Sequence, residues 1–158
     1  MKNNFVKGVL IGVVVTLLLI FLSAYSFADR IMILEDKSKY GLEETVNLLK
    51  QEAVSLGWKV PTTHSLNKSV AKAGYVVDPA EVVELCNPNY AGEILKNYSD
   101  RIVSSMMPCR ISVYYNENNE VIVSRMNTGL ISKLFGGNIS DIMSVATKDT
   151  EKIISTVL

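Results

Sequence analysis

The sequence predicts an α+β protein: one small domain with a mainly antiparallel sheet packed by helices, preceded by one N-terminal transmembrane helix. Three observations support this class. Residues 9–27 form an uncharged apolar run, residues 42–56 carry apolar side chains at steps of three and four, and residues 110–125 alternate as two strands around an Asn-rich turn. About 130 residues follow the apolar run, which is enough for one domain with a single core.

The apolar run has the length and composition of a membrane-spanning helix. As a helix rising ~1.5 Å per residue it reaches about 28 Å, close to the hydrocarbon thickness of a bilayer. A cleaved secretory signal is the alternative, because Lys2 and Lys7 precede the run and Ser26-Phe27-Ala28 has the small-x-small form of a cleavage site. A signal core is usually only about 7 to 15 residues long, so we favour a retained anchor.

This interpretation divides the chain into a short cytoplasmic leader (1–8), an anchor in the lipid bilayer (9–28) and an exported domain (29–158). Positive residues lie on both sides of the anchor and do not decide its orientation. A short leader followed by a folded domain most simply leaves the leader inside the cell. We therefore expect a single-pass protein of the cell membrane with its domain on the extracytoplasmic side.

The first half of the domain alternates between strand and helix patterns. Apolar residues at 31–34 predict a first strand, and 42–56 predict a helix with acidic residues in its first turn and Gly57 as its stop. A brief strand is expected at 58–62, and Pro61 with the polar run after it should end the strand. Residues 67–72 form a weaker helix candidate.

The second half begins with a strand predicted by composition at 80–85. Residues 90–98 predict a helix that buries Ile94, Leu95 and Tyr98, and 110–115 with 121–125 predict the clearest hairpin. Two final helices are expected at 128–135 and 139–158, separated by two glycines. The buried side of the last helix should carry four residues: Ile142, Ala146, Ile153 and Val157.

Charge and motifs exclude several classes of function. Lys+Arg and Asp+Glu are equal at 16 each, so nothing in the charge balance favours a nucleic acid as partner. The sequence has no G-x-S-x-G motif and no glycine-rich phosphate loop. We therefore expect a binding domain more than an enzyme.

Several short motifs, in order, resemble those of the domain of unknown function 302 family. They comprise residues 57–60, Asn87-Pro88 with Ala91 and Leu95 after it, Pro108, and the strand 111–114 with its Asn-rich hairpin and 121–123. The resemblance covers roughly residues 42–135. It implies a compact α+β domain that often pairs as a homodimer, and it brings no established activity. The two cysteines of this chain depart from the commoner form of the family.

Both cysteines stand where a strand meets a loop or a helix. Cys86 closes an apolar run and precedes a helix-start signal, while Cys109 opens the alternating strand of the hairpin. We expect both thiols at the mouth of one sheet. Four neighbours would shape this mouth: Asn87, Pro88, Pro108 and Arg110.

Three interpretations of the cysteine pair stay open. A structural disulfide would stabilise an exported domain by roughly 3 kcal/mol for a loop of about 24 residues. A reactive or metal-binding pair is the second, because the helix N-terminus near Cys86 and Arg110 beside Cys109 would both favour thiolate. Two buried, unlinked thiols are the third.

A metal would need ligands beyond two thiolates. Met106, Met107 and His64 are the candidates, although His64 stands in what reads as a polar loop. Soft sulfur ligands suit Cu(I), a haem or an iron–sulfur iron. The expected function is therefore a binding module for a small ligand, a metal or a protein at the Cys86/Cys109 mouth, with a thiol–disulfide redox protein as the alternative.

Overall fold

The computed structural model describes residues 2–26 and 28–158. The chain divides into two compact units, Met1–Met32 and Ile33–Leu158, which we describe separately. The cleavage motif expected at 26–28 includes residue 27, which lies outside the described residues.

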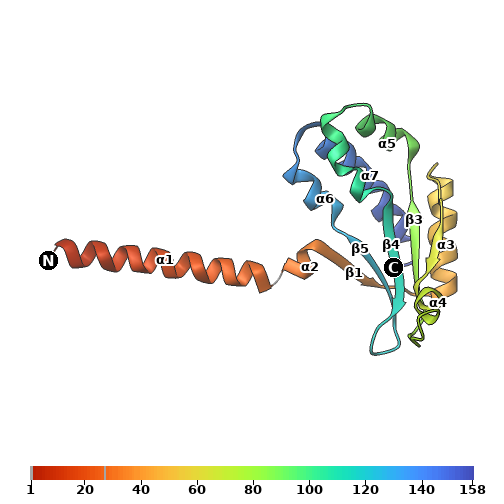
Figure 1. Cartoon of the computed structure of the whole chain (residues 1–158), viewed down its shortest axis with the longest axis horizontal. Coiled ribbons are helices and arrows are strands. Elements are labelled where there is room, and N and C mark those ends of the chain that lie inside the picture. The colour runs from red at the N-terminus through yellow and green to blue at the C-terminus, as the bar shows by residue number, and fades with distance from the viewer. Residues whose placement is uncertain (1, 27) are drawn as a thin grey trace. The chain divides into compact units, whose positions relative to one another are not determined.

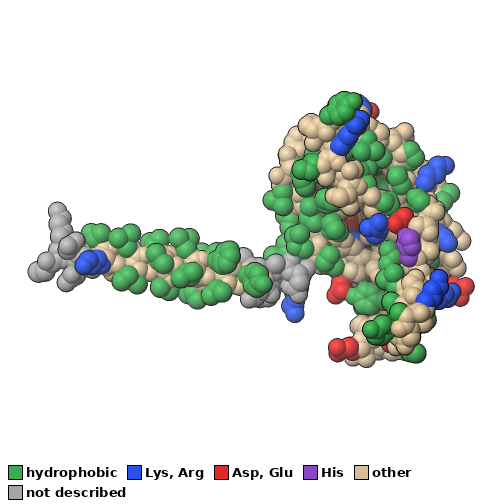
Figure 2. All heavy atoms as spheres, viewed as in Figure 1, with side chains coloured by type: hydrophobic (Ala, Val, Ile, Leu, Met, Phe, Trp, Pro, Cys, Tyr) green, Lys and Arg blue, Asp and Glu red, His purple; other side chains and the backbone are tan. Residues whose placement is uncertain are grey.

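The first unit consists of α1 (Lys2–Ser26) and the short α2 (Ala28–Met32). Within α1, Val6–Ser23 has a mean hydropathy of 2.5, so among the described residues this one helix is long and apolar enough to cross a membrane. Figure 2 shows apolar side chains along both visible edges of this helix, as expected of a helix that meets lipid on every side. The same composition fits a signal sequence, so the cleaved alternative stays open.

The second unit is built on one antiparallel sheet with the order β1-β5-β4-β3-β2. Its five strands are β1 (Ile33–Lys37), β2 (Thr63–Ser65), β3 (Ala80–Leu85), β4 (Cys109–Tyr115) and β5 (Val121–Met126). Its helices, including the 3₁₀ helices η1 and η2, are α3 (Leu42–Ser55), α4 (Leu66–Ala71), α5 (Pro88–Leu95), η1 (Ser99–Met106), α6 (Thr128–Ile131), η2 (Ser132–Leu134) and α7 (Gly137–Ser155). The α+β prediction is confirmed (Figure 1).

The main core lies where α3 and α7 pack on one face of the sheet. Alternation along the strands sends every second side chain into this core, and the intervening side chains point to the opposite face. The fully buried members include Leu49 and Ala53 of α3, Ile153 and Ile154 of α7, and Val83, Leu85, Ile111, Val113 and Val123 of the strands. A smaller cluster joins Ile94, Val103 and Ile139 where α5, η1 and α7 meet.

One buried cation ties the edge of the sheet to α7. The side chain of Arg125 on β5 is 8% exposed and donates to Asp36 of β1 and to both carboxylate oxygens of Glu151 on α7. Burial acts against the charged guanidinium, but the bonds from it to the two carboxylates raise the pKa of Arg125 above its ordinary value.

Three local predictions are wrong in position. Ile31 and Met32 belong to α2, and the first strand begins at Ile33. The strand expected at 58–62 is reduced to a single bridge between Lys59 and Cys86, while β2 forms at 63–65. The helix expected at 90–98 ends at Leu95, so Leu95 and Tyr98 are exposed, the latter by 84%. Val103 of η1 is buried beside Ile94 instead.

Candidate functional site

The pairing of β3 with β4 brings the two cysteines to one end of the sheet. Cys109 is the first residue of β4 and lies opposite Leu85, the last residue of β3. Cys86 follows directly, and its backbone N–H and C=O bond to Lys59 at 2.9 and 2.8 Å. Both cysteines are free thiols in the structure, and both line the same cavity.

This cavity has a volume of about 50 Å³ and an almost entirely apolar wall. Such a volume holds a few atoms or waters and is much smaller than the roughly 300 to 1,000 Å³ of pockets that take organic ligands or cofactors. It does not fit a haem. Five sulfur-bearing side chains line it, and we call this set the sulfur cavity: Cys86, Cys109, Met106, Met107 and Met143.

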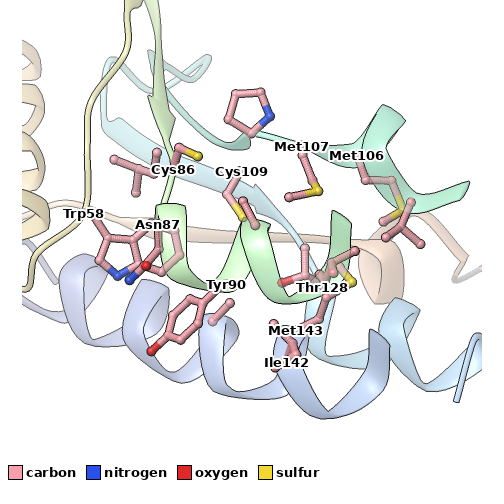
Figure 3. Close-up of a pocket in the computed structure, with 16 residues that line it drawn as sticks. Trp58, Cys86, Asn87, Tyr90, Met106, Met107, Cys109, Thr128, Ile142 and Met143 are labelled. Carbon is pink, nitrogen blue, oxygen red and sulfur yellow. The ribbon is translucent and has the colours of Figure 1, made fainter. Parts of the chain in front are cut away.

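The side chains of the wall are turned toward a common space (Figure 3). The thiols of Cys86 and Cys109 and the thioether of Met107 point into it, and Trp58 and Tyr90 lie together along one side. None of the residues that line the cavity is acidic, basic or a histidine. In the part of the chain that the structure describes, no group of three His, Cys, Asp or Glu side chains is placed to hold a metal ion.

Burial governs the protonation of Cys109. Desolvation raises the pKa of its thiol, and the neighbouring Cys86 raises it further, so the neutral thiol is favoured. This environment does not favour the thiolate that the reactive-pair interpretation assumed at Cys109. Arg110 gives no help, because neighbouring residues of a strand point to opposite faces. Its side chain is 57% exposed and donates to Glu84 at 3.2 Å.

Of the four residues expected to shape the mouth, Asn87 and Pro108 line the sulfur cavity, whereas Pro88 and Arg110 do not. Asn87 caps α5 by accepting a hydrogen bond from the N–H of Asn89 at 3.1 Å, with Pro88 in the first turn. The side chain of Arg110 pairs with Glu84, and Arg110 lines a second cavity together with Cys109.

The proposed metal ligands divide in the same way. Met106 and Met107 lie in the cavity wall, whereas His64 does not. His64 is in strand β2, opposite Val82, and not in a polar loop; its Nε2 atom lies 3.2 Å from Oε1 of Glu84. Burial acts to raise the pKa of Glu84, but the bonds from His64 and Arg110 lower it overall.

Sequence reasoning missed Met143 and an aromatic wall. Met143 completes an i, i+3, i+4, i+7 stripe with Ile139, Ile142 and Ala146, so the signal for its inward position was present.

The aromatic wall is Trp58 and Tyr90, whose rings meet edge to face at 5.8 Å and 71°. Trp58 Nε1–H and the Tyr90 hydroxyl both donate to Oδ2 of Asp149, at 3.4 and 2.9 Å. The bond to Asp149, followed by burial, raises the pKa of Tyr90.

A second cavity of about 140 Å³ adjoins the first and shares four lining residues with it: Met106, Pro108, Cys109 and Thr128. Arg125 and Glu151 form part of its wall, and they are already paired with each other. Cys109 therefore stands between an apolar cavity and a more polar one.

Comparison with known proteins supports the same fold. A model of the family described as Domain of unknown function DUF302 matches residues 34–157. The crystal structure of an uncharacterized conserved protein DUF302 from Bacillus stearothermophilus superimposes with a TM-score of 0.72 at 18% identity, covering 81% of this chain and 99% of that one. No curated protein matches. The chain belongs to the DUF302 family.

Proposed function

We propose that this protein is a membrane-tethered binding domain whose sulfur cavity takes a small, soft ligand. The observation that carries the proposal is the convergence of five sulfur-bearing side chains on one cavity with no ionisable wall other than its two thiols and a tyrosine. Sulfur is polarizable and prefers soft ligands. At about 50 Å³ the cavity suits an ion or a molecule of a few atoms.

Access to the thiols tests the proposal directly. Methyl methanethiosulfonate is small and transfers a methylthio group to a thiolate as methanesulfinate leaves, whereas a polymer-linked maleimide is too large for the cavity. We expect the folded chain, in detergent and without added reductant, to gain methylthio groups at Cys86 and Cys109 and to resist the polymer reagent. Full resistance to both reagents in the folded state, with full reaction after unfolding, would show that the cavity is sealed.

A thiol–disulfide redox protein is the second candidate. The shared cavity favours it, because two thiols there could each lose a proton while the pair passes two electrons to a disulfide acceptor. Mass analysis of the chain as isolated from its membrane distinguishes this redox candidate from the binding domain. Thiols that appear only after dithiothreitol treatment would support either redox cycling or a structural disulfide, and would contradict a binding site built on free thiols.

The tether itself is part of the proposal. Alkaline extraction should leave the full-length chain in the membrane fraction, with its domain open to protease from the extracytoplasmic side. Replacing Leu17 by Arg near the middle of the apolar helix should weaken insertion by about 3 to 4 kcal/mol. A soluble mature form beginning after Ala28 would contradict a retained anchor. The homodimer implied by the family stays a prediction.

A further inference from the structure

The donor atoms of the sulfur cavity limit which ligands it can hold. Two thiols and three thioethers line it, and the wall offers no imidazole and no carboxylate. Mg²⁺ and Ca²⁺ take oxygen ligands, and structural Zn²⁺ sites take four ligands from Cys, His, Asp or Glu. The cavity supplies two such ligands, Cys86 and Cys109, so it matches neither class.

Charge limits the choice further. An apolar wall disfavours a net charge inside it. A monovalent soft ion bound by one thiolate and neutral thioethers is uncharged as a complex, and a second thiolate leaves a charge of only minus one. A divalent ion would need both thiolates to become neutral and would still lack two of the four ligands that Zn²⁺ requires.

Cu(I) meets the condition on donor atoms, because it prefers thiolate and thioether sulfur and does not require oxygen or nitrogen ligands. With both thiolates bound, its complex keeps a net charge of minus one. Methionine adds flexible, polarizable sulfur that can adjust to an ion. Three of the protein's six methionines line this one cavity. Figure 3 shows the Met107 thioether turned into the same space as the two thiols.

We infer that the sulfur cavity is a Cu(I) site in which Cys86 and Cys109 are the thiolate ligands and Met107 is the thioether ligand. This inference rests on the proposed function and names its ligand. Loading is a substitution without electron transfer: each thiol that forms a Cu–S bond releases its proton to solvent, and copper stays Cu(I) throughout. Met106 and Met143 complete the wall without binding the ion.

The test is a titration of the full-length, reduced chain in detergent under nitrogen, with Cu(I) supplied against the competing chelator bicinchoninate. We expect one Cu(I) per chain. Trp58 is the only tryptophan of the protein and lines the cavity, so its fluorescence should be quenched in step with loading. Zn²⁺ at the same concentration should neither bind nor change the fluorescence.

Variants assign the ligands. Cys86→Ser and Cys109→Ser should each weaken Cu(I) binding by about 100-fold or more, and Met107→Leu by about 10-fold, since even outer positions around metal sites cost 10 to 100-fold. Met32→Leu is the matched control, because Met32 of α2 lines neither cavity, and the affinity of this variant should equal that of the wild type. Circular dichroism and thermal unfolding identify any variant that does not fold.

The outcomes separate the inference from the proposed function. Unchanged Cu(I) affinity in a folded Cys86→Ser, Cys109→Ser double variant would overturn the site. A larger loss from Met143→Leu than from Met107→Leu would overturn the assignment of Met107. If Cu(I) does not bind while methyl methanethiosulfonate still reaches both thiols, the copper inference fails and the binding cavity stands. If neither binds, both fail.

Discussion

Replacing Arg125 by Met should strongly destabilise the domain. The guanidinium joins three elements: β5, which carries it, β1 through Asp36, and α7 through Glu151. It makes a two-bond contact with Glu151, at 3.0 and 2.6 Å, and a further bond to Asp36. Met keeps most of the apolar stem, so the substitution isolates the loss of the charged group.

The exposure of the two carboxylates, Asp36 and Glu151, decides how much the free energy of unfolding falls. Breaking a buried ion pair by removing one partner costs roughly 3 to 5 kcal/mol, because the other charge stays buried and unpaired. Here the side chains of Asp36 and Glu151 are 43% and 40% exposed, so water can solvate them after the change. We therefore expect the lower limit, about 3 kcal/mol. For a unit of roughly 125 residues this lowers the Tm by about 11 °C.

Urea unfolding followed by Trp58 fluorescence measures this change, since Trp58 is buried in the main core. Lys37→Met is the matched control: it breaks the exposed Lys37–Glu120 pair, 2.6 Å long, and should cost less than about 1 kcal/mol. A loss for Arg125→Met no larger than that of Lys37→Met would refute the reasoning, because it would mean that the buried pairing contributes nothing beyond a surface contact.

Three further outcomes follow from single contacts. Leu49→Ala, at a fully buried site, should cost about 3 kcal/mol in urea unfolding and leave Cu(I) stoichiometry unchanged. Burial and then Glu35 raise the pKa of Tyr114 to about 12 from an ordinary 10.0. The stabilisation that this phenol contributes is therefore complete below pH 10 and is lost as pH rises toward 12. In Tyr114→Phe the free energy of unfolding should fall less steeply over this alkaline range. Asp149→Ala removes the main cause of the raised Tyr90 pKa, so spectroscopic titration should find that phenol ionising at lower pH.

Elements with a strong period were predictable from sequence. The helix α3 follows from apolar residues at steps of three and four, and the β4–β5 hairpin follows from alternation around an Asn-rich turn in which Asn119 adopts a positive φ of 60°. Each of these elements buries one face against the same core along its whole length. The burial therefore leaves a regular pattern of apolar residues within the segment itself.

The elements whose bounds the sequence predicted wrongly depend on partners distant in sequence. β2 has only three residues, too few to show a period, and it exists because β3 offers a free edge to pair with. The expected burial of Leu95 and Tyr98 assumed that one helix continues through them. The chain instead turns into η1, where Val103 fills the space beside Ile94 and Ile139.

The charge that the sequence suggested beside the Cys109 thiol was misplaced for a different physical reason. Sequence neighbours suggested a cation beside Cys109, but Arg110 projects to the other face of the sheet, where Glu84 pairs with it. The sulfur cavity beside Cys109 is walled largely by residues of α5, η1 and α7 and is apolar, and the charged residues Arg125 and Glu151 line only the second cavity. Adjacency along a strand is therefore a poor guide to electrostatic contact, whereas residues two apart, or opposite across the ladder, are informative.

The register of β3 against β4 is the condition on which the sulfur cavity depends. Leu85 pairs with Cys109, and this pairing puts Cys109 on the helix-covered face and leaves Cys86 just past the end of the ladder. A slip of one residue would turn Cys109 to the open face and bring Arg110 inward, because the side-chain period of a strand is two. Burial of Val83, Leu85, Ile111 and Val113 opposes such a slip, since it would expose a set of core side chains at once. The same hydrophobic pattern that specifies the sheet therefore also specifies which face receives the Cys109 thiol.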